Sequence, residues 1–181
     1  MFNYEEAFSR NIGWVTKEEQ QKLRNTKVAI GGLGGVGGDH TIVLARLGIG
    51  NFHISDLDDY DVANFNRQAG ANMSTLGKAK AAVMEETVRG INPEATIKNF
   101  DSGINEDNLD EFLEGVDIYV DSLDIFVLEI RRKVFRRCYE KGIPTITAAP
   151  MGMGTAFLVF MPGKMSFDEY FELVCRLLLE K

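Results

Sequence analysis

The sequence predicts an α/β fold, namely a Rossmann-like, doubly wound and mostly parallel sheet with helices on both faces. Short apolar runs alternate with helical patterns along most of the 181 residues. The first run, Lys27–Ile30, leads directly into a glycine-rich turn that opens a helix. The next run ends in an acid, Asp56. Strand, turn, helix and strand make one βαβ unit, whose crossover is right-handed and whose strands are parallel.

Local signals define the remaining elements in order. Thr16 followed by Glu19 is a capping box that opens a helix. Gly48 and Gly142 each stop a helical pattern, and Gly90 ends another near an Asn-Pro turn. The expected helices run from Thr16 to Leu23, from the glycine turn to Leu47, from Gly77 to Arg89, from Glu106 to Leu113, from Phe126 to Lys141, and onward from Phe167. The expected strands cover residues 27–30, 51–56, 95–100, 116–121, 144–149 and 155–160.

Length and composition limit the class of protein. The chain is long enough for one α/β core, and 45% hydrophobic with 26% charged residues is typical of a soluble protein. A net charge of −7 without a basic run argues against a general nucleic-acid or anionic-membrane surface. Neither a signal peptide nor a membrane-spanning run is apparent, so we expect a cytoplasmic protein. We expect an N-terminal arm over residues 1–26, a Rossmann-like domain over 27–165, and a C-terminal helix over 166–181 that also fits the start of a longer chain.

The glycine turn predicts nucleotide binding. Gly32, Gly34 and Gly37 match G-x-G-x-x-G, and Gly35 adds a fourth glycine. Glycines let backbone N–H groups approach phosphate oxygens, and the helix N-terminus adds partial positive charge. Asp56, 22 residues after Gly34, is placed to accept hydrogen bonds from ribose hydroxyls. The motif alone leaves NAD and ATP open.

A longer series of motifs separates the two nucleotides. An acid-rich D-x-D segment follows the second strand, then N-x-x-R-Q, then a lysine that opens the next helix, and later an acidic element at a strand end. In this order the chain resembles the ubiquitin-activating-enzyme-like superfamily, which includes the ThiF, MoeB and HesA adenylyltransferases. The resemblance runs from about residue 10 to residue 160. The residues that carry it are Gly32–Gly37, Asp56, Asp58, Asn64–Gln68, Lys80 and Asp121–Asp124.

The resemblance implies an ATP-dependent adenylyltransferase that joins AMP to a carboxylate and releases pyrophosphate. The substrate in such enzymes is usually the C-terminus of a ubiquitin-like or sulfur-carrier protein. Some relatives instead activate a peptide, or a carboxyl-like group on a modified tRNA base. The carboxylate is already ionised near neutral pH, so the reaction needs charge neutralisation and positioning rather than a general base.

The resemblance also assigns roles to residues. Arg67 would bind phosphate oxygens with its planar fork and Lys80 as a point charge. Asp124 would hold Mg²⁺ near the leaving pyrophosphate. Arg10 resembles an early arginine that reaches the γ-phosphate of the neighbouring subunit, which implies a homodimer. The implied nucleotide-binding residues are Gly32, Gly34, Gly35, Gly37, Asp56, Asp58, Asn64 and Gln68.

Each of the four catalytic candidates also has a structural interpretation. Arg67 fits an ion pair with the acidic run over residues 56–61. Lys80 fits a solvated first-turn lysine, although a cation there opposes the helix dipole. Asp124 fits an N-cap for the helix near Phe126. Arg10 fits a plain surface charge.

The chain departs from its relatives at the cysteines. Many relatives carry two C-x-x-C pairs for zinc, whereas this chain has only Cys138 and Cys175, far apart. We therefore expect no zinc, no disulfide and two buried thiols. Cys175 lies in an apolar helical run, and Cys138 follows Arg136 and Arg137, a setting that lowers a thiol pKa. We expect neither to act as a nucleophile.

Three other residues need an interpretation. His40 is expected on a helix surface, and His53 within strand packing, rather than as metal ligands. Asp39 suits the helix dipole, but it would repel a bound triphosphate.

Two other functions explain part of the pattern. An NAD-dependent oxidoreductase explains the glycine turn and Asp56, but it leaves Arg67, Lys80 and Asp124 without a shared role. A non-catalytic subunit of the same superfamily would bind a partner protein, with or without a nucleotide.

Overall fold

The computed structural model describes residues 1–173. Its strands are β1 (Lys27–Gly31), β2 (Asn51–Ser55), β3 (Thr96–Phe100), β4 (Ile118–Asp121), β5 (Thr145–Met151) and β6 (Gly154–Phe160). They form one sheet in the order β3-β2-β1-β4-β5-β6, in which only β6, paired with β5, is antiparallel. The chain reverses its direction of winding between β1 and β4, and ligands of open α/β sheets bind at such a switch point. The expected mostly parallel, Rossmann-like sheet is confirmed.

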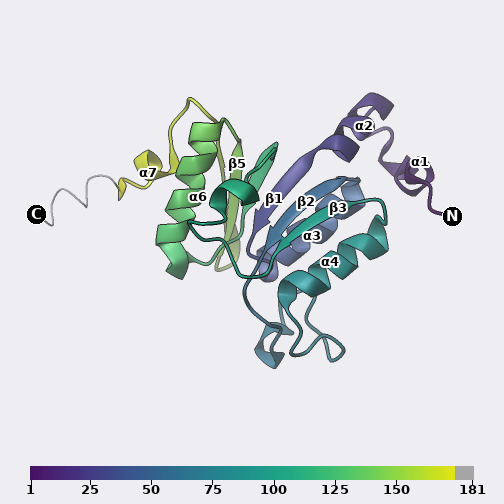
Figure 1. Ribbon diagram of the computed structural model, residues 1–181, viewed down its shortest axis with the longest axis horizontal. Helices are drawn as coiled ribbons and strands as arrows, with labels where there is room; N and C mark the ends of the chain where they lie inside the picture. Colours follow the sequence, from purple (N-terminus) through teal and green to yellow (C-terminus); the bar gives the residue numbers. More distant parts are fainter. Residues whose placement is uncertain (174–181) are drawn as a thin grey trace, which may run out of the picture.

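Helices cover both faces of this sheet (Figure 1). In the figure α3 and α4 lie along β1, β2 and β3, while α6 and α7 lie at the opposite end of the molecule from α1 and α2. The α-helices are α1 (Tyr4–Ala7), α2 (Lys17–Asn25), α3 (Gly35–Leu47), α4 (Lys80–Ile91), α5 (Leu109–Phe112), α6 (Leu128–Lys141) and α7 (Phe167–Tyr170). The 3-10 helices are η1 (Ser9–Asn11), η2 (Val62–Asn64) and η3 (Ile125–Val127).

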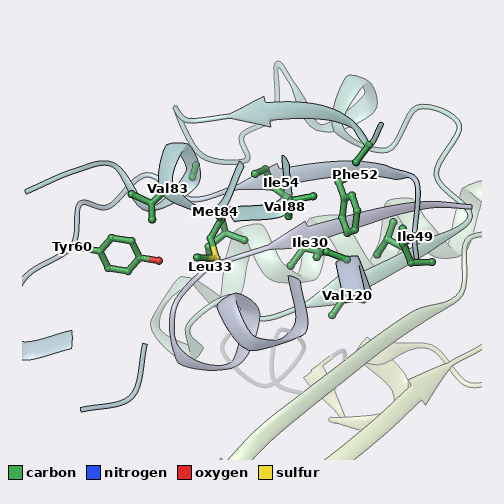
Figure 2. Packing of buried hydrophobic residues seen from close by; sticks show 14 residues of the cluster. Ile30, Leu33, Ile49, Phe52, Ile54, Tyr60, Val83, Met84, Val88 and Val120 are labelled. Carbon is green, nitrogen blue, oxygen red and sulfur yellow. The ribbon is translucent and has the colours of Figure 1, made fainter. Parts of the chain in front are cut away.

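Alternate residues of the strands supply two separate hydrophobic cores. In β1, Val28 and Ile30 belong to the core beneath α3 and α4, whereas Ala29 belongs to the core on the other face. This alternation follows from the two-residue period of a strand. Figure 2 shows the first core, where Ile30 of the sheet lies near Met84 and Val88 of α4. Both faces of the sheet are therefore buried at its centre, along β1, β2 and β4.

Aromatic rings form much of the second core. Phe112 of α5, Tyr119 of β4, Phe135 of α6 and Phe160 of β6 follow one another edge to face, with centroid separations of 6.1, 6.1 and 5.4 Å. Phe167 of α7 lies 4.1 Å from Phe135, centroid to centroid. Such pairs add about 0.5–1.5 kcal/mol each beyond the area they bury. They attach α5, α6 and α7 to the face opposite α3 and α4.

The N-terminal helices pack where the strands begin. The predicted capping box of α2 is present, since the Thr16 side chain accepts the Glu19 N–H and the Glu19 side chain accepts that of Thr16. Asn11 and Gln20 both donate side-chain N–H groups to the carbonyl oxygen of Leu47, at 3.0 Å each. Leu47 ends α3, shortly before β2 begins. The N-terminal helices α1, η1 and α2 therefore lie at the amino-terminal ends of the strands, opposite the glycine turn.

Several predicted helix boundaries were wrong. The helix expected from Gly77 begins only at Lys80, because Gly77 has a φ of +75° and Ala79 forms an isolated antiparallel bridge with Asp59. It also continues through Gly90 to Ile91.

Three more helices are shorter than expected. The helix expected over residues 106–113 is reduced to α5, because the side chain of Asn105 accepts N–H groups from Asp107 and Asn108 in a preceding turn. Residues 125–127 form η3 instead of the first turn of α6. The helix expected from Phe167 is the four-residue α7, and its expected extension over 174–181 lies outside the described residues. The proposed division at residues 26 and 165 stays a prediction.

Candidate functional site

The glycine turn is held between β2 and β4. The N–H of Gly32 donates to the carbonyl oxygen of Ser55 at 2.8 Å, and the N–H of Ser122 donates to that of Gly31 at 2.8 Å. Gly32 has a φ of +86°, and a Cβ atom there would collide with the carbonyl oxygen of Ser122. Only glycine fits this position, which lies directly at the switch point of the sheet.

Helix α3 begins on this turn without a side-chain cap at its N-terminus. Gly34 is its N-cap and offers no side chain for capping. A Cβ atom on Gly37 would overlap the carbonyl oxygen of Gly32, so the first turn of the helix lies against the loop. The first N–H groups of a helix have no partner inside the helix, and together with the helix dipole they bind anions such as phosphate.

Asp56 reaches the turn from the end of β2, as expected. Its Oδ2 accepts the N–H of Leu33 at 2.6 Å, and its Oδ1 accepts the N–H of Asp58 at 2.9 Å. The carboxylate is therefore fixed between the glycine turn and the acidic segment. A ribose contact for Asp56 stays a prediction.

Lys80 is connected to the same network. Its Nζ lies 3.0 Å from Oδ2 of Asp58, and its N–H donates to the Asp58 carbonyl oxygen at 2.9 Å. The Lys80 side chain is 7% exposed and that of Asp58 is 60% exposed. The alternative of a solvated lysine is wrong. Hydrogen bonds lead from the Leu33 amide through Asp56 and Asp58 to Lys80.

Arg67 lies against the start of α3. Its Cγ and Cδ atoms come within 3.6 and 3.9 Å of the position that a Cβ atom on Gly35 would take. Its guanidinium donates to the carbonyl oxygen of Ala63 and to Oδ1 of Asn66, both at 2.9 Å. Both acceptors are neutral, so these contacts do not support the alternative of an ion pair with the acidic run. The exposed guanidinium retains donors for another anion.

Two buried polar atoms near the turn have no hydrogen-bond partner among residues 1–173. They are Oε1 of Gln68 and Oγ of Ser122. Nε2 of Gln68 lies 3.6 Å from the Cβ position of Gly34, and Cβ of Ser122 lies 3.0 Å from that of Gly37. An unpaired buried polar group costs about 1–3 kcal/mol. Their position beside the helix N-terminus fits a site that is completed by a polar ligand or water.

Asn64 and Asp124 both serve local turns. Oδ1 of Asn64 accepts the N–H of Asp61 in the capping box of η2, which leaves its NH₂ group for a ligand. Oδ1 of Asp124 accepts the N–H of Phe126 at 3.1 Å, so the predicted N-cap alternative is present, for η3. Asp124 is exposed and lies two residues beyond Ser122, on the β4 side of the glycine turn. Its second oxygen is available to a cation.

Arg10 is not part of this cluster. It lies exposed in η1, at the edge of the sheet where the strands begin, whereas the other candidates lie where they end. Within one subunit Arg10 therefore cannot join Arg67 and Lys80. Its predicted role requires a second copy of the chain.

An ion pair that was not predicted lies beneath the loop after β4. Asp121 is fully buried, and its Oδ2 lies 2.6 and 2.7 Å from two guanidinium nitrogens of Arg131 in α6. Burial raises the pKa of Asp121, and Arg131, Thr147 and the Leu123 amide oppose that rise. The sequence offered one signal, an acid at a strand end, but nothing that identified Arg131 as its partner.

The structure shows the surroundings of Cys138 and of both histidines. Cys138 is buried, and burial raises its thiol pKa to about 12, so the neighbouring arginines do not activate it. His53 is buried with Nδ1 2.8 Å from the Phe112 carbonyl oxygen, which confirms strand packing. His40 is half-buried rather than on the surface, because α3 packs closely along β1 and α4. Cys175 lies outside the described residues.

Residues 1–173 hold neither a metal-binding cluster nor a membrane-spanning helix. In this part of the chain no three His, Cys, Asp or Glu side chains lie together as a metal site, and no helix is both long and apolar enough to cross a bilayer. Two cavities, of about 550 and 380 Å³, lie away from the glycine turn. The larger is lined by α5, the turn after it and the end of α6, and the smaller lies between α6 and α7. Neither cavity is lined by residues of the candidate site.

Known proteins are similar to this chain in sequence and in fold. The chain is 34% identical over 142 residues to the tRNA threonylcarbamoyladenosine dehydratase of Bacillus subtilis, covering 78% of this chain and 55% of that protein. It is 33% identical over 151 residues to the molybdopterin-synthase adenylyltransferase of Haemophilus influenzae, covering 81% of this chain and 59% of that protein. The chain thus spans just over half the length of these relatives.

Solved structures agree with the sequence comparisons. The Escherichia coli tRNA N6-threonylcarbamoyladenosine dehydratase in complex with ATP superposes with a TM-score of 0.75 at 30% identity, covering 79% of this chain and 58% of that one. Escherichia coli MccB with ATP gives a TM-score of 0.75 at 26% identity, covering 97% of this chain and 55% of that one. The ThiF family model matches residues 8–173. The chain, with its glycine turn at the β1–β4 switch point, belongs to the ThiF family.

Proposed function

We propose that this chain is the ATP-binding part of an adenylyltransferase that activates a carboxylate as an acyl adenylate. One observation carries the proposal: Arg67 and the network ending at Lys80 reach the glycine turn from two sides. Arg67 lies against Gly35, and Lys80 is linked to Leu33 through two carboxylates. Two cations beside a helix N-terminus suit a triphosphate better than the two phosphates of NAD.

The proposed reaction needs no base from the protein. A carboxylate oxygen forms a bond to the α-phosphorus of ATP as the bond to the bridging oxygen of pyrophosphate breaks, and pyrophosphate leaves with the electron pair. Arg67, Lys80 and the first amides of α3 neutralise the phosphate oxygens, while Asp56 binds the ribose. Asn64 and Gln68 supply neutral hydrogen bonds. Mg²⁺, which Asp124 would hold, supplies further positive charge at the pyrophosphate.

A protein or peptide C-terminus is the carboxylate that we propose. Apolar side chains stand exposed beside Asp124, with Ile125 70% and Phe126 92% accessible. Met151, Met153 and Phe157 are exposed on the β5–β6 hairpin. Exposed apolar patches are typical of protein-binding surfaces, whereas an acidic chain is a poor general surface for RNA. A sulfur-carrier or ubiquitin-like tail fits this description.

We also propose that the active unit is a homodimer. Arg10 lies at the edge of the sheet away from the glycine turn, so only a neighbouring subunit can bring such an arginine to the phosphates. Ile12 and Trp14, which follow it, are 41% and 94% exposed and would be buried in a subunit contact.

Pyrophosphate exchange tests the proposal. Equilibrium titration with ATP and with NAD⁺ should show Mg²⁺-dependent binding of ATP alone. Labelled pyrophosphate should then enter ATP when synthetic peptides ending in Gly-Gly are added, and not without a carboxylate substrate. Arg67→Ala should reduce ATP affinity about 10–100-fold.

The matched control is Arg46→Ala, because Arg46 is an exposed arginine at the other end of α3. It should leave ATP binding unchanged. NAD⁺ binding in preference to ATP, or equal effects of the two substitutions, would reject the proposal. Unchanged ATP affinity in Arg67→Ala would favour a non-catalytic subunit.

A further inference from the structure

The buried ion pair between Asp121 and Arg131 joins α6 to the carboxyl end of β4. Two nitrogens of Arg131 lie within 2.7 Å of Oδ2 of Asp121, and the hydroxyl of Tyr119 lies 3.3 Å from its Oδ1. The Asp121 side chain is fully buried and that of Arg131 is 14% exposed. Removing one partner of such a pair leaves an uncompensated buried charge. The pair therefore fixes the end of β4 strongly.

The loop that leaves β4 at this point lies against the glycine turn. Asp121 is paired in register with Gly31 in β1 and with Thr147 in β5. The next residue, Ser122, donates its N–H to the carbonyl oxygen of Gly31 and packs its own carbonyl against Gly32. Asp124 follows two residues later. Its side chain bonds within its own loop, so the start of the loop sets its position.

Arg131 is held by contacts with β5, with α7 and with its own helix α6. Its guanidinium donates to Oγ1 of Thr147 at 2.9 Å. It also lies 5.5 Å from the ring centroid of Phe167 and 6.0 Å from that of Phe135. Each contact restricts the long side chain to one orientation, in which it points at Asp121. The ion pair therefore restrains the end of β4 relative to α6 and β5.

We propose that Arg131 is a positioning residue for the nucleotide site. Through Asp121 it holds the loop Ser122–Asp124 against Gly32, and so it sets the distance between the Asp124 carboxylate and the phosphates bound at the glycine turn. The inference rests on the proposed function, because Asp124 is taken as the Mg²⁺ ligand. It adds a residue outside the site that controls how the site is assembled.

The experiment compares Arg131→Met with Arg132→Met. Arg132 is the next residue of α6, is 12% exposed, and forms an ion pair of 2.9 Å with Asp168 of α7. Each variant removes a largely buried arginine from an ion pair, and in Arg132→Met the carboxylate of Asp168 keeps Arg136 as a second partner. Hydrogen exchange of peptides covering residues 122–127 measures the loop directly. Titration with ATP at several Mg²⁺ concentrations measures the affinity of the site for MgATP and its Mg²⁺ requirement.

The proposal expects faster exchange in residues 122–127 for Arg131→Met only. Its affinity for MgATP should fall about tenfold and its Mg²⁺ requirement should rise, with no such change in Arg132→Met. If Arg131→Met does not fold, Arg131→Lys keeps the charge, and intermediate exchange is then expected. Unchanged loop exchange, or equal changes in both variants, would overturn the proposal. If the wild type binds no ATP, the adenylation hypothesis fails, while the exchange data still decide whether Arg131 holds the loop.

Discussion

The ammonium group of Lys80 lies 3.0 Å from the carboxylate of Asp58, and the backbone N–H of Lys80 donates to the carbonyl oxygen of the same residue. Lys80 opens α4, where its positive charge opposes the helix dipole, and its side chain is buried. A lysine placed so unfavourably gains from a further anion nearby. A phosphate at the glycine turn would supply it.

Replacing Lys80 by methionine should weaken ATP binding while leaving the fold intact. The methionine fills the buried space without a charge, so we expect a change in unfolding free energy within about 1 kcal/mol. The loss of one charged hydrogen bond to phosphate should lower ATP affinity about 10–100-fold. Isothermal titration measures the affinity. Lys98→Met on β3, which breaks the ion pair with Glu111 of α5, is the control and should bind ATP like the wild type. Equal losses of ATP affinity in both variants would refute a specific role for Lys80.

Gly32→Ala should be strongly destabilising. The residue has a φ of +86°, and its Cβ would meet the carbonyl oxygen of Ser122, so we expect a loss of at least about 2 kcal/mol in unfolding free energy and little ATP binding. Gly90→Ala is the opposite case. Gly90 lies inside α4 with open space around it, so alanine should stabilise by about 0.5–1 kcal/mol. Urea denaturation measures the unfolding free energy of both variants. A Gly32→Ala variant as stable as the wild type would contradict the proposed packing of the turn.

The elements and the glycine turn were predictable because their signals are local. The capping box at Thr16, the turn glycines and the acid at the end of β2 all act within a few residues of themselves. Helix starts were less predictable. The segment before Lys80 pairs Ala79 with Asp59, a contact between residues 20 positions apart that no helical periodicity contains.

The candidate site was predictable only as a set of residue types. The resemblance brought Arg67 and Lys80 together, but the burial of Lys80 and its connection through Asp56 depend on how β2 and α4 meet. The pair Asp121–Arg131 joins a strand to the following helix across ten residues. Arg131 lies in a run of basic residues on α6, and only the packing of α6 on the sheet determines which of them pairs with Asp121.

Acid should destabilise the protein through His53. Burial lowers its pKa, although the Phe112 carbonyl opposes the shift. The unfolded chain takes up the proton near pH 6.5 and the folded protein only at lower pH, so stability is lost as the pH falls below 6.5, by up to about 1.4 kcal/mol per pH unit. Urea denaturation between pH 7.5 and 5 should show a shallower slope for His53→Gln. His40→Gln should remove a further part of the pH dependence of the unfolding free energy, since burial also lowers the pKa of His40. An unchanged pH dependence in His53→Gln would count against this account.

Cys138 should be unreactive in the folded protein. Burial raises its pKa to about 12, so the thiol is protonated at pH 8 and shielded from reagents. Alkylation by iodoacetamide should be at least about 100-fold slower than in denaturing urea, since it requires opening of the core. Peptide mass spectrometry separates Cys138 from Cys175. Rapid labelling of Cys138 in the folded protein would reopen its role as a nucleophile.

The two edge strands of the sheet, β3 and β6, differ in how readily they would accept an additional strand. At one border β3 carries Lys98, whose charge discourages another chain from adding a strand. At the other border β6 exposes Phe157 and Val159 to solvent, at 62% and 47% exposure, and none of its own residues is charged. Strand addition is therefore more favourable at β6 than at β3, so an added polypeptide strand would extend the sheet beyond β6.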